Sequence, residues 1–238
     1  MNGYNQSPFA NITPVVKNLL IINIIFFIGT YTLRYAGIDL VRWLSAFYFN
    51  SPNFHPWQFV SYMFMHANLA HIFFNMFALF MFGPILEYTM GAKRFLQYYF
   101  ITGIGALVLQ MLVQAIEVHG VLGSFTVAGV DPNLNLNAAG MAKVQEIYQV
   151  PILGASGAIF GLLLAFGFLF PNMEMMVLFI PVPVKAKYLV AGYIVIELID
   201  GFGQFQGDSV AHFAHLGGAL FGYIILKIWR LQRPNNFY

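Results

Sequence analysis

Three stretches of this sequence contain residues that together could carry out nucleophilic chemistry. His71 and Asn75 are four residues apart, so on a helix their side chains would point the same way. Ser156 and His215 follow much further along the chain, each inside an apolar stretch with glycines beside it. A serine hydroxyl becomes a useful nucleophile when a neutral histidine takes its proton, and N–H donors then stabilise the resulting oxyanion. These four residues supply every group that such a reaction needs.

The composition places these residues in a membrane protein. Of 238 residues, 59% are hydrophobic and only 8% are charged, whereas soluble domains carry roughly 25% charged residues. The mean hydropathy is +0.71, so a soluble domain could not cover its surface. A net charge of +2 gives no electrostatic footprint for nucleic acid. The absence of cysteine excludes disulfides, cysteine nucleophiles and thiolate metal sites.

Six apolar segments approach the roughly 20 residues that a membrane-spanning helix needs. They predict an all-α, polytopic fold with a bundle of six transmembrane helices. The segments are residues 15–33, 69–90, 95–116, 152–170, 188–202 and 210–228. The fifth is short, because charged residues flank it on both sides.

The charges of the loops predict the orientation of this bundle, because basic residues concentrate in cytoplasmic loops. Six spans put both termini on one side, together with eight of the eleven basic residues, namely Lys17, Lys93, Arg94, Lys185, Lys187, Lys227, Arg230 and Arg233. We therefore expect both termini in the cytoplasm.

The domain organisation follows from this orientation. Residues 1–14 are predicted to be a short cytoplasmic segment, 15–230 a single membrane domain and 231–238 a cytoplasmic tail. Two long connections, at about residues 34–68 and 117–150, fall on the non-cytoplasmic side. The first is rich in aromatic residues and is expected in the membrane interface. The second is rich in glycine, asparagine and alanine; we expect an exposed excursion and assign it no role.

The candidate reactive residues share one depth. His71, Ser156 and His215 each lie about two to six residues from the non-cytoplasmic end of their span, on the order of 3–9 Å below the surface. Glycines at four-residue spacing, Gly157 with Gly161 and Gly218 with Gly222, allow two helix backbones to approach closely. The fourth and sixth spans are therefore expected to meet and bring the serine to a histidine.

Acidic residues are not expected at this site. Glu197 and Asp200 come at the end of the fifth span, and we place neither at the depth of His215. Glu87 is expected to be a helix-end anchor facing the cytoplasm. The predicted site is therefore a Ser–His dyad without a carboxylate, and His212 receives no role.

Three motifs, in this order, resemble those of the rhomboid family of intramembrane serine proteases. The stretch 66–75 is similar to the family's H-x4-H-x3-N signature, 154–157 to its G-x-S-G motif and 214–218 to its A-H-x-x-G motif. The resemblance covers roughly residues 57–222. Each motif alone is a weak pattern, but all three in order are highly specific.

The resemblance implies roles for individual residues. Ser156 would be the nucleophile and His215 the general base, preferred over His212 because a glycine follows three residues later. His71 and Asn75 would donate hydrogen bonds to the oxyanion, together with the Ser156 backbone N–H.

It also implies supporting residues. Phe160 sits where the family usually has an aromatic ring stacked on the catalytic histidine, and His66 matches a residue that stabilises the first external loop. Gly154, Gly157 and Gly218 complete the motifs. The family's Trp-Arg pair is replaced here by Trp57 and Gln58, so the anchoring of that loop is expected to differ.

The resemblance further implies substrates that are membrane proteins with a transmembrane helix, cut near the non-cytoplasmic face. It implies no cofactor, metal or nucleic acid, and a compact form of this kind is expected in a bacterial inner membrane. A proton-coupled transporter would need midplane carboxylates and repeats. A metalloprotease would need an H-E-x-x-H motif, or an acidic third ligand near His212 and His215, which we do not expect. A non-catalytic rhomboid-like binding protein remains an alternative.

Overall fold

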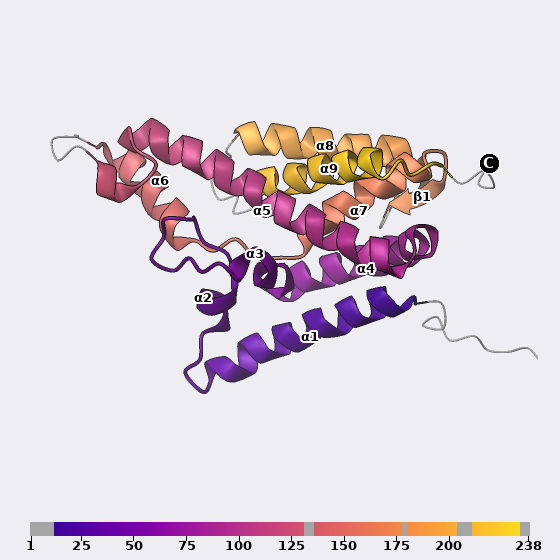
Figure 1. The fold of residues 1–238 in the computed structure, drawn as a ribbon, viewed down its shortest axis with the longest axis horizontal. Coiled ribbons are helices and arrows are strands. Elements are labelled where there is room, and N and C mark those ends of the chain that lie inside the picture. Colours follow the sequence, from indigo (N-terminus) through magenta and orange to yellow (C-terminus); the bar gives the residue numbers. More distant parts are fainter. Residues whose placement is uncertain (1–11, 131–135, 178–179, 204–210, 234–238) are drawn as a thin grey trace, which may run out of the picture.

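The structure is a computed structural model, and it describes residues 12–130, 136–177, 180–203 and 211–233 (Figure 1). The predicted N-terminal segment and C-terminal tail therefore lie largely outside the described residues. The elements are α1 (Pro14–Arg34), α2 (Leu40–Leu44), α3 (Gln58–Ser61), η2 (Tyr62–Phe64), α4 (Leu69–Met90), α5 (Ala92–Leu122), η3 (Val127–Gly129), α6 (Ala138–Gln149), α7 (Ser156–Leu169), β1 (Glu174–Val177), β2 (Ile180–Lys185), α8 (Ala186–Gly203) and α9 (His212–Ile228).

The all-α prediction is confirmed, since one two-stranded hairpin is the only sheet within the described ranges. The six predicted segments fall on α1, α4, α5, α7, α8 and α9. By length and composition, α1, α4 and α5 can cross a membrane, whereas α7 and α9 are shorter apolar helices. The count of six spans therefore stays a prediction. Helix α7 begins at Ser156 rather than residue 152, because Gly154 has a φ of +127° and interrupts the helix.

Helices α5, α7 and α9 form the centre of the bundle, with α1 and α4 at one edge and α8 at the other (Figure 1). Leu107 and Leu162 are fully buried in this centre. On the outer face of α1, by contrast, Ile25 and Ile28 are more than half exposed. An apolar core inside an equally apolar outer surface suits a bundle surrounded by lipid.

The start of α1 is held by an acidic residue from α4. Glu87 is buried, and its carboxylate accepts hydrogen bonds from the Thr13 hydroxyl and from the backbone N–H groups of Val15 and Val16, at 3.1 and 2.9 Å. The first N–H groups of a helix have no partner within it, and the helix dipole favours a negative charge there. Glu87 thus anchors a helix end, as predicted, but its carboxylate is buried against the start of α1 instead of facing outward.

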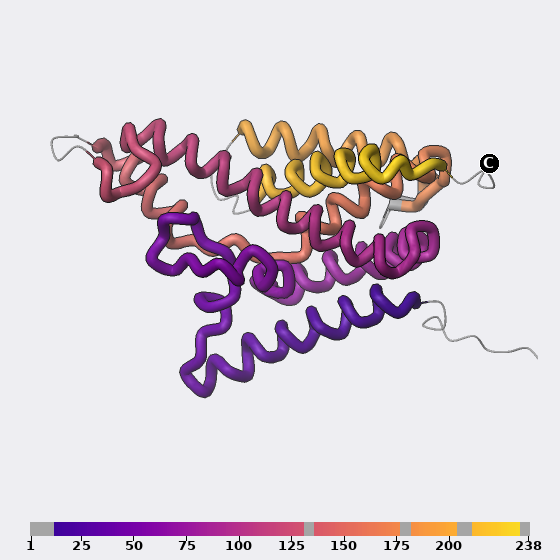
Figure 2. Tube along the Cα trace, viewed as in Figure 1, coloured from indigo at the N-terminus to yellow at the C-terminus, as the bar shows by residue number. Residues whose placement is uncertain are grey.

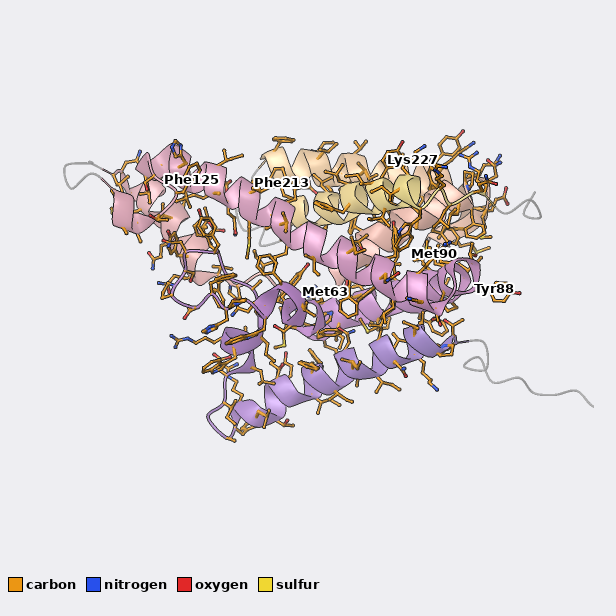
Figure 3. The ribbon with its side chains drawn as sticks, in the orientation of Figure 1. Met63, Tyr88, Met90, Phe125, Phe213 and Lys227 are labelled. Atoms are coloured by element: carbon orange, nitrogen blue, oxygen red, sulfur yellow. The ribbon has the colours of Figure 1, made fainter. Side chains whose placement is uncertain are left out.

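Glu87→Ala is expected to lower the free energy of unfolding by about 2 kcal/mol or more, because it leaves buried N–H donors without an acceptor. Thermal unfolding in detergent measures the effect. Tyr88→Ala is the matched control, since Tyr88 is 88% exposed and points away from the bundle (Figure 3); its change should stay within about 0.5 kcal/mol. Equal destabilisation by the two substitutions would contradict the capping role.

The first outer loop folds back on itself through polar contacts, of which those of Gln58 are partly buried. The Trp57 indole N–H donates to the Trp43 carbonyl oxygen at 2.9 Å. Gln58 is fully buried, donates to the Asn53 carbonyl oxygen at 2.9 Å and accepts from the His55 N–H at 3.1 Å. The neutral amide of Gln58 thus anchors this loop at the position where the resemblance led us to expect an arginine.

The second outer connection is not the simple exposed excursion that we predicted. Helix α5 continues into it as far as Leu122, and α6 packs back against that extension (Figure 2). Tyr48 and Tyr148 lie in a separate small core, in which the Tyr48 hydroxyl donates to the Phe125 carbonyl oxygen at 2.9 Å. The Ser51 hydroxyl donates to the Tyr148 carbonyl oxygen at 2.7 Å. The insertion at residues 117–150 therefore packs against the first outer loop and holds it in place.

Backbone hydrogen bonds hold the segment just before α7. Ala46 and Ile152 form an isolated antiparallel bridge, with both backbone hydrogen bonds between 2.7 and 2.8 Å. Two residues later, the Gly154 N–H donates to the Tyr62 carbonyl oxygen at 2.9 Å. The segment that leads into Ser156 is thus fixed on both sides.

A short hairpin that the apolar pattern did not predict joins α7 to α8. Strands β1 and β2 pair antiparallel, with Glu174 opposite Lys185 and Met175 opposite Val184. The turn contains residues outside the described ranges, and the hairpin lies at the end of the bundle away from the insertion (Figure 1).

Candidate active site

Ser156 and His215 meet where α7 and α9 begin. Ser156 is the first residue of α7, and His215 lies one turn into α9. The Ser156 Oγ and the His215 Nε2 are 2.9 Å apart, which is hydrogen-bond distance. A neutral imidazole with its proton on Nδ1 would accept the serine hydroxyl proton at Nε2. The structure thus joins the predicted nucleophile to the histidine that we preferred, rather than to His212.

Glycines make this approach possible. A Cβ added to Gly218 would lie 1.9 Å from the Gly157 carbonyl oxygen, so α9 and α7 touch backbone to backbone. One turn further along, a Cβ on Gly222 would lie 3.2 Å from the Gly161 Cα. The Tyr98 hydroxyl from α5 donates to the Gly161 carbonyl oxygen at 2.8 Å. The two glycine rows therefore determine how closely the two reactive side chains approach.

The ring of His215 is held from one side by Phe160. Their centroids are 4.3 Å apart and the rings are nearly parallel, at 6°. Phe160 lies one turn after Ser156 on the same helix, so α7 supplies both the hydroxyl and the surface on which the imidazole rests.

His71 reaches the same place from α4. The Asn68 side chain accepts the His71 backbone N–H at 2.9 Å and so begins the helix just before this residue. The Ala67 N–H donates to His71 Nδ1 at 3.4 Å, which leaves the ring proton on Nε2. A Cβ added to Gly154 would lie 2.8 Å from the His71 Nε2 and 3.6 Å from the Ser156 Oγ. Only glycine fits between the two groups.

Asn75 lies one turn further along α4 and is buried. Its amide Nδ2 has no hydrogen-bond partner among the described residues. Buried donors are nearly always paired in native proteins, so this one is a candidate to bind an acceptor from outside the protein.

His66 supports this arrangement and is almost fully buried, at 1% exposure. Its ring packs edge-on against His71, with centroids 5.0 Å apart. Burial lowers the pKa of His66 to about 3, and the neighbouring His71 acts in the same direction. His66 is therefore a neutral packing partner near pH 7.

The prediction that no carboxylate reaches His215 is wrong. Glu197 from α8 is buried, and its Oε1 lies 3.0 Å from the His215 Nδ1. Its Oε2 lies 2.7 Å from the His212 Nδ1. A signal for this was present: Glu197 lies six residues before Gly203, the last residue of α8, a distance from the outer end like that of the other reactive residues. On α8, Val190, Glu197 and Gly201 are buried at spacings of seven and four, which is one helical face.

Glu197, His212 and His215 also form a set of possible metal ligands, with their ligand atoms all within 4.8 Å of one another. The expectation that the two histidines have no acidic neighbour is therefore wrong as well. Two imidazoles and a carboxylate are a donor set that zinc accepts. Here, however, each carboxylate oxygen already lies beside one imidazole nitrogen.

Comparison with known proteins agrees with the motifs. A family model described as Rhomboid domain matches residues 53–231. The chain is 27% identical to Rhomboid-like protein 11, chloroplastic, of Arabidopsis thaliana, over 90% of this chain and 64% of that protein. It is 28% identical to Rhomboid protein 1, mitochondrial, of Saccharomyces cerevisiae, over 73% and 43%. With Rhomboid protease AarA of Providencia stuartii the identity is 27%, over 71% and 54%. The chain thus spans about two fifths to two thirds of the length of these relatives.

Proposed function

The chain belongs to the rhomboid family, and from that premise we propose that it is an intramembrane serine endopeptidase with Ser156 as nucleophile and His215 as general base. Family membership and the long apolar helices make it a multi-pass integral membrane protein. The observation that carries the proposal is the 2.9 Å contact between the Ser156 Oγ and the His215 Nε2, with Phe160 stacked on the imidazole.

The proposed reaction begins when the His215 Nε2 takes the hydroxyl proton as the Ser156 Oγ attacks a peptide carbonyl. The developing oxyanion is stabilised by the Ser156 backbone N–H at the start of α7, by the Asn75 Nδ2 and by the His71 Nε2–H. His215 then gives its proton to the leaving amine. Water hydrolyses the acyl-enzyme by the same proton transfers in reverse order. No step requires a cofactor, a metal or nucleic acid.

The proposed substrates are transmembrane helices of other membrane proteins. The reactive atoms lie at the starts of α7 and α9, on the side of the bundle where the long outer connections lie (Figure 1), and the loop charges favour cytoplasmic termini. Cleavage would therefore occur near the non-cytoplasmic face of the bilayer. We propose a bacterial inner membrane as its location. Two of the relatives carry organellar names, one chloroplastic and one mitochondrial.

Labelling with a fluorophosphonate probe tests the proposal, because such probes react with activated serines. The detergent-solubilised protein should be labelled at Ser156, and labelling should vanish in Ser156→Ala and in His215→Ala. No labelling of folded wild-type protein, in detergent and again in lipid, would overturn the proposal. It would leave the non-catalytic rhomboid-like binding protein as the better interpretation.

A further inference from the structure

We propose that Glu197 is a positioning residue that holds the His215 imidazole in its reactive orientation and tautomer, so that the site works as a Ser–His–Glu triad. This inference rests on the proposed function. It concerns a residue outside the three motifs, on α8, which supplies no other member of the proposed catalytic set.

The side chains of Glu197, His215 and Ser156 contact one another in sequence. The Glu197 Oε1 lies 3.0 Å from the His215 Nδ1, and the His215 Nε2 lies 2.9 Å from the Ser156 Oγ. The side chains of Glu197 and His215 are each only 12% exposed. A carboxylate behind the base and a nucleophile in front of it is the order in which catalytic triads act.

The carboxylate selects the correct tautomer. His215 can accept the serine proton only if Nε2 carries none, so its own proton must sit on Nδ1. An acceptor 3.0 Å from Nδ1 favours that form. When His215 takes up the second proton, the imidazolium faces a negative charge across a short distance in surroundings of low polarity, which stabilises the charged intermediate.

The contact is not fully aligned at rest. The His215 Nδ1 is buried and has no hydrogen bond of good angle among the described residues, although the carboxylate lies within ion-pair distance. Catalytic hydrogen bonds are often poorly aligned before substrate binds. The stacked Phe160 ring restricts tilting of the His215 imidazole, so the ring stays close to the carboxylate.

His212 holds the other end of the carboxylate. Its Nδ1 lies 2.7 Å from the Glu197 Oε2, so the two oxygens face two different imidazoles. A buried carboxylate is tolerated when its oxygens have donors. His212 would thus keep Glu197 in place and leave Oε1 for His215, which gives His212 the role that its sequence context did not reveal.

Three variants of the full-length protein test the proposal. Glu197→Ala removes the acceptor, Glu197→Gln keeps an oxygen but removes the charge, and Asp200→Asn removes an acid from the same helix. Asp200 is the matched control because the structure gives it no ion pair with a described residue. The measurements are the maximal rate of fluorophosphonate labelling, the probe's binding constant, the unfolding temperature and the ¹⁵N spectrum of histidine-labelled protein, in which His215→Ala identifies the His215 signals.

We expect Glu197→Ala to slow the maximal labelling rate by about 10²-fold and Glu197→Gln by at least as much, since an amide beside Nδ1 can favour the wrong tautomer and the corresponding acid-to-amide change costs up to about 10⁴-fold in soluble triads. Probe binding should change little, and Asp200→Asn should label at the wild-type rate. The ¹⁵N signals of His215 should report a proton on Nδ1 in the wild type and a mixture of tautomers in Glu197→Ala.

Several results would overturn the proposal while leaving the proposed function intact. These are wild-type labelling by both Glu197 variants, an unchanged His215 tautomer in Glu197→Ala, or a loss of rate fully explained by a lower unfolding temperature. Stoichiometric zinc in the purified protein, with labelling lost on chelation, would also overturn it by making the cluster a metal site. A wild-type protein without any labelling would instead refute the proposed function itself.

Discussion

Gly218→Ala should abolish fluorophosphonate labelling as completely as Ser156→Ala does. The new Cβ would lie 1.9 Å from the Gly157 carbonyl oxygen, and that oxygen belongs to backbone and cannot rotate away. Helices α7 and α9 must then move apart by about 1 Å. The 2.9 Å distance between the Ser156 Oγ and the His215 Nε2 lengthens with them. A misplacement of about 1 Å can cost 10²-fold in rate, and here it also breaks the hydrogen bond that activates the nucleophile.

The labelling rate of purified protein measures this effect, and the matched control is Gly192→Ala. Gly192 lies on α8, and a Cβ there meets nothing within 4 Å. The control introduces the same methyl group into a helix of the same bundle, so its labelling rate and unfolding temperature should match those of the wild type. A Gly218→Ala protein labelled at the wild-type rate would show that the backbone contact does not set the geometry of the site.

Asn75→Ala is expected to separate activity from stability. Removing one good oxyanion donor costs about 10²–10³-fold in rate, so labelling should slow by that factor. The unfolding temperature should not fall, because the Asn75 Nδ2 is a buried donor with no partner among the described residues. Removing an unpaired buried polar group relieves its desolvation cost rather than breaking a bond.

Asn23→Ala is the control for this prediction. Asn23 is also a buried amide, but it lies on α1 and its Nδ2 donates to the Leu19 carbonyl oxygen at 2.8 Å. Its removal should leave labelling unchanged. A marked fall in the unfolding temperature of Asn75→Ala, with labelling intact, would assign Asn75 a structural role and remove it from the oxyanion site.

Hydropathy and helical spacing predicted the helices that carry the site, because an apolar segment of sufficient length has few alternatives in a membrane. The depth of Ser156 and His215 and the glycines beside them were enough to predict that their helices meet. Glu197 was misjudged because a charge near the end of a short apolar segment is hard to distinguish from an end anchor. Its partners come from another helix, and their distance depends on how α8 packs against α9.

The outer structure was predicted least well. Helix α6 contains three alanines and several polar residues, so its apolar pattern is weak. It is stabilised by the small core around Tyr48 and Tyr148. That core joins residues about 100 positions apart along the chain, a pairing that local sequence patterns do not encode. The same reasoning applies to Gln58, whose burial depends on how the whole loop folds.

The cap that Glu87 places on α1 has a consequence for synthesis. The carboxylate and the N–H groups that it binds are 71 and 72 residues apart. At about 5–20 residues per second, a ribosome needs roughly 4–14 s to add that stretch. During this interval the amides at the start of α1 must be satisfied by water at the membrane surface. The docking of α1 therefore follows translation of α4, and α1 is locked in place only after the stretch that carries Glu87 has been made.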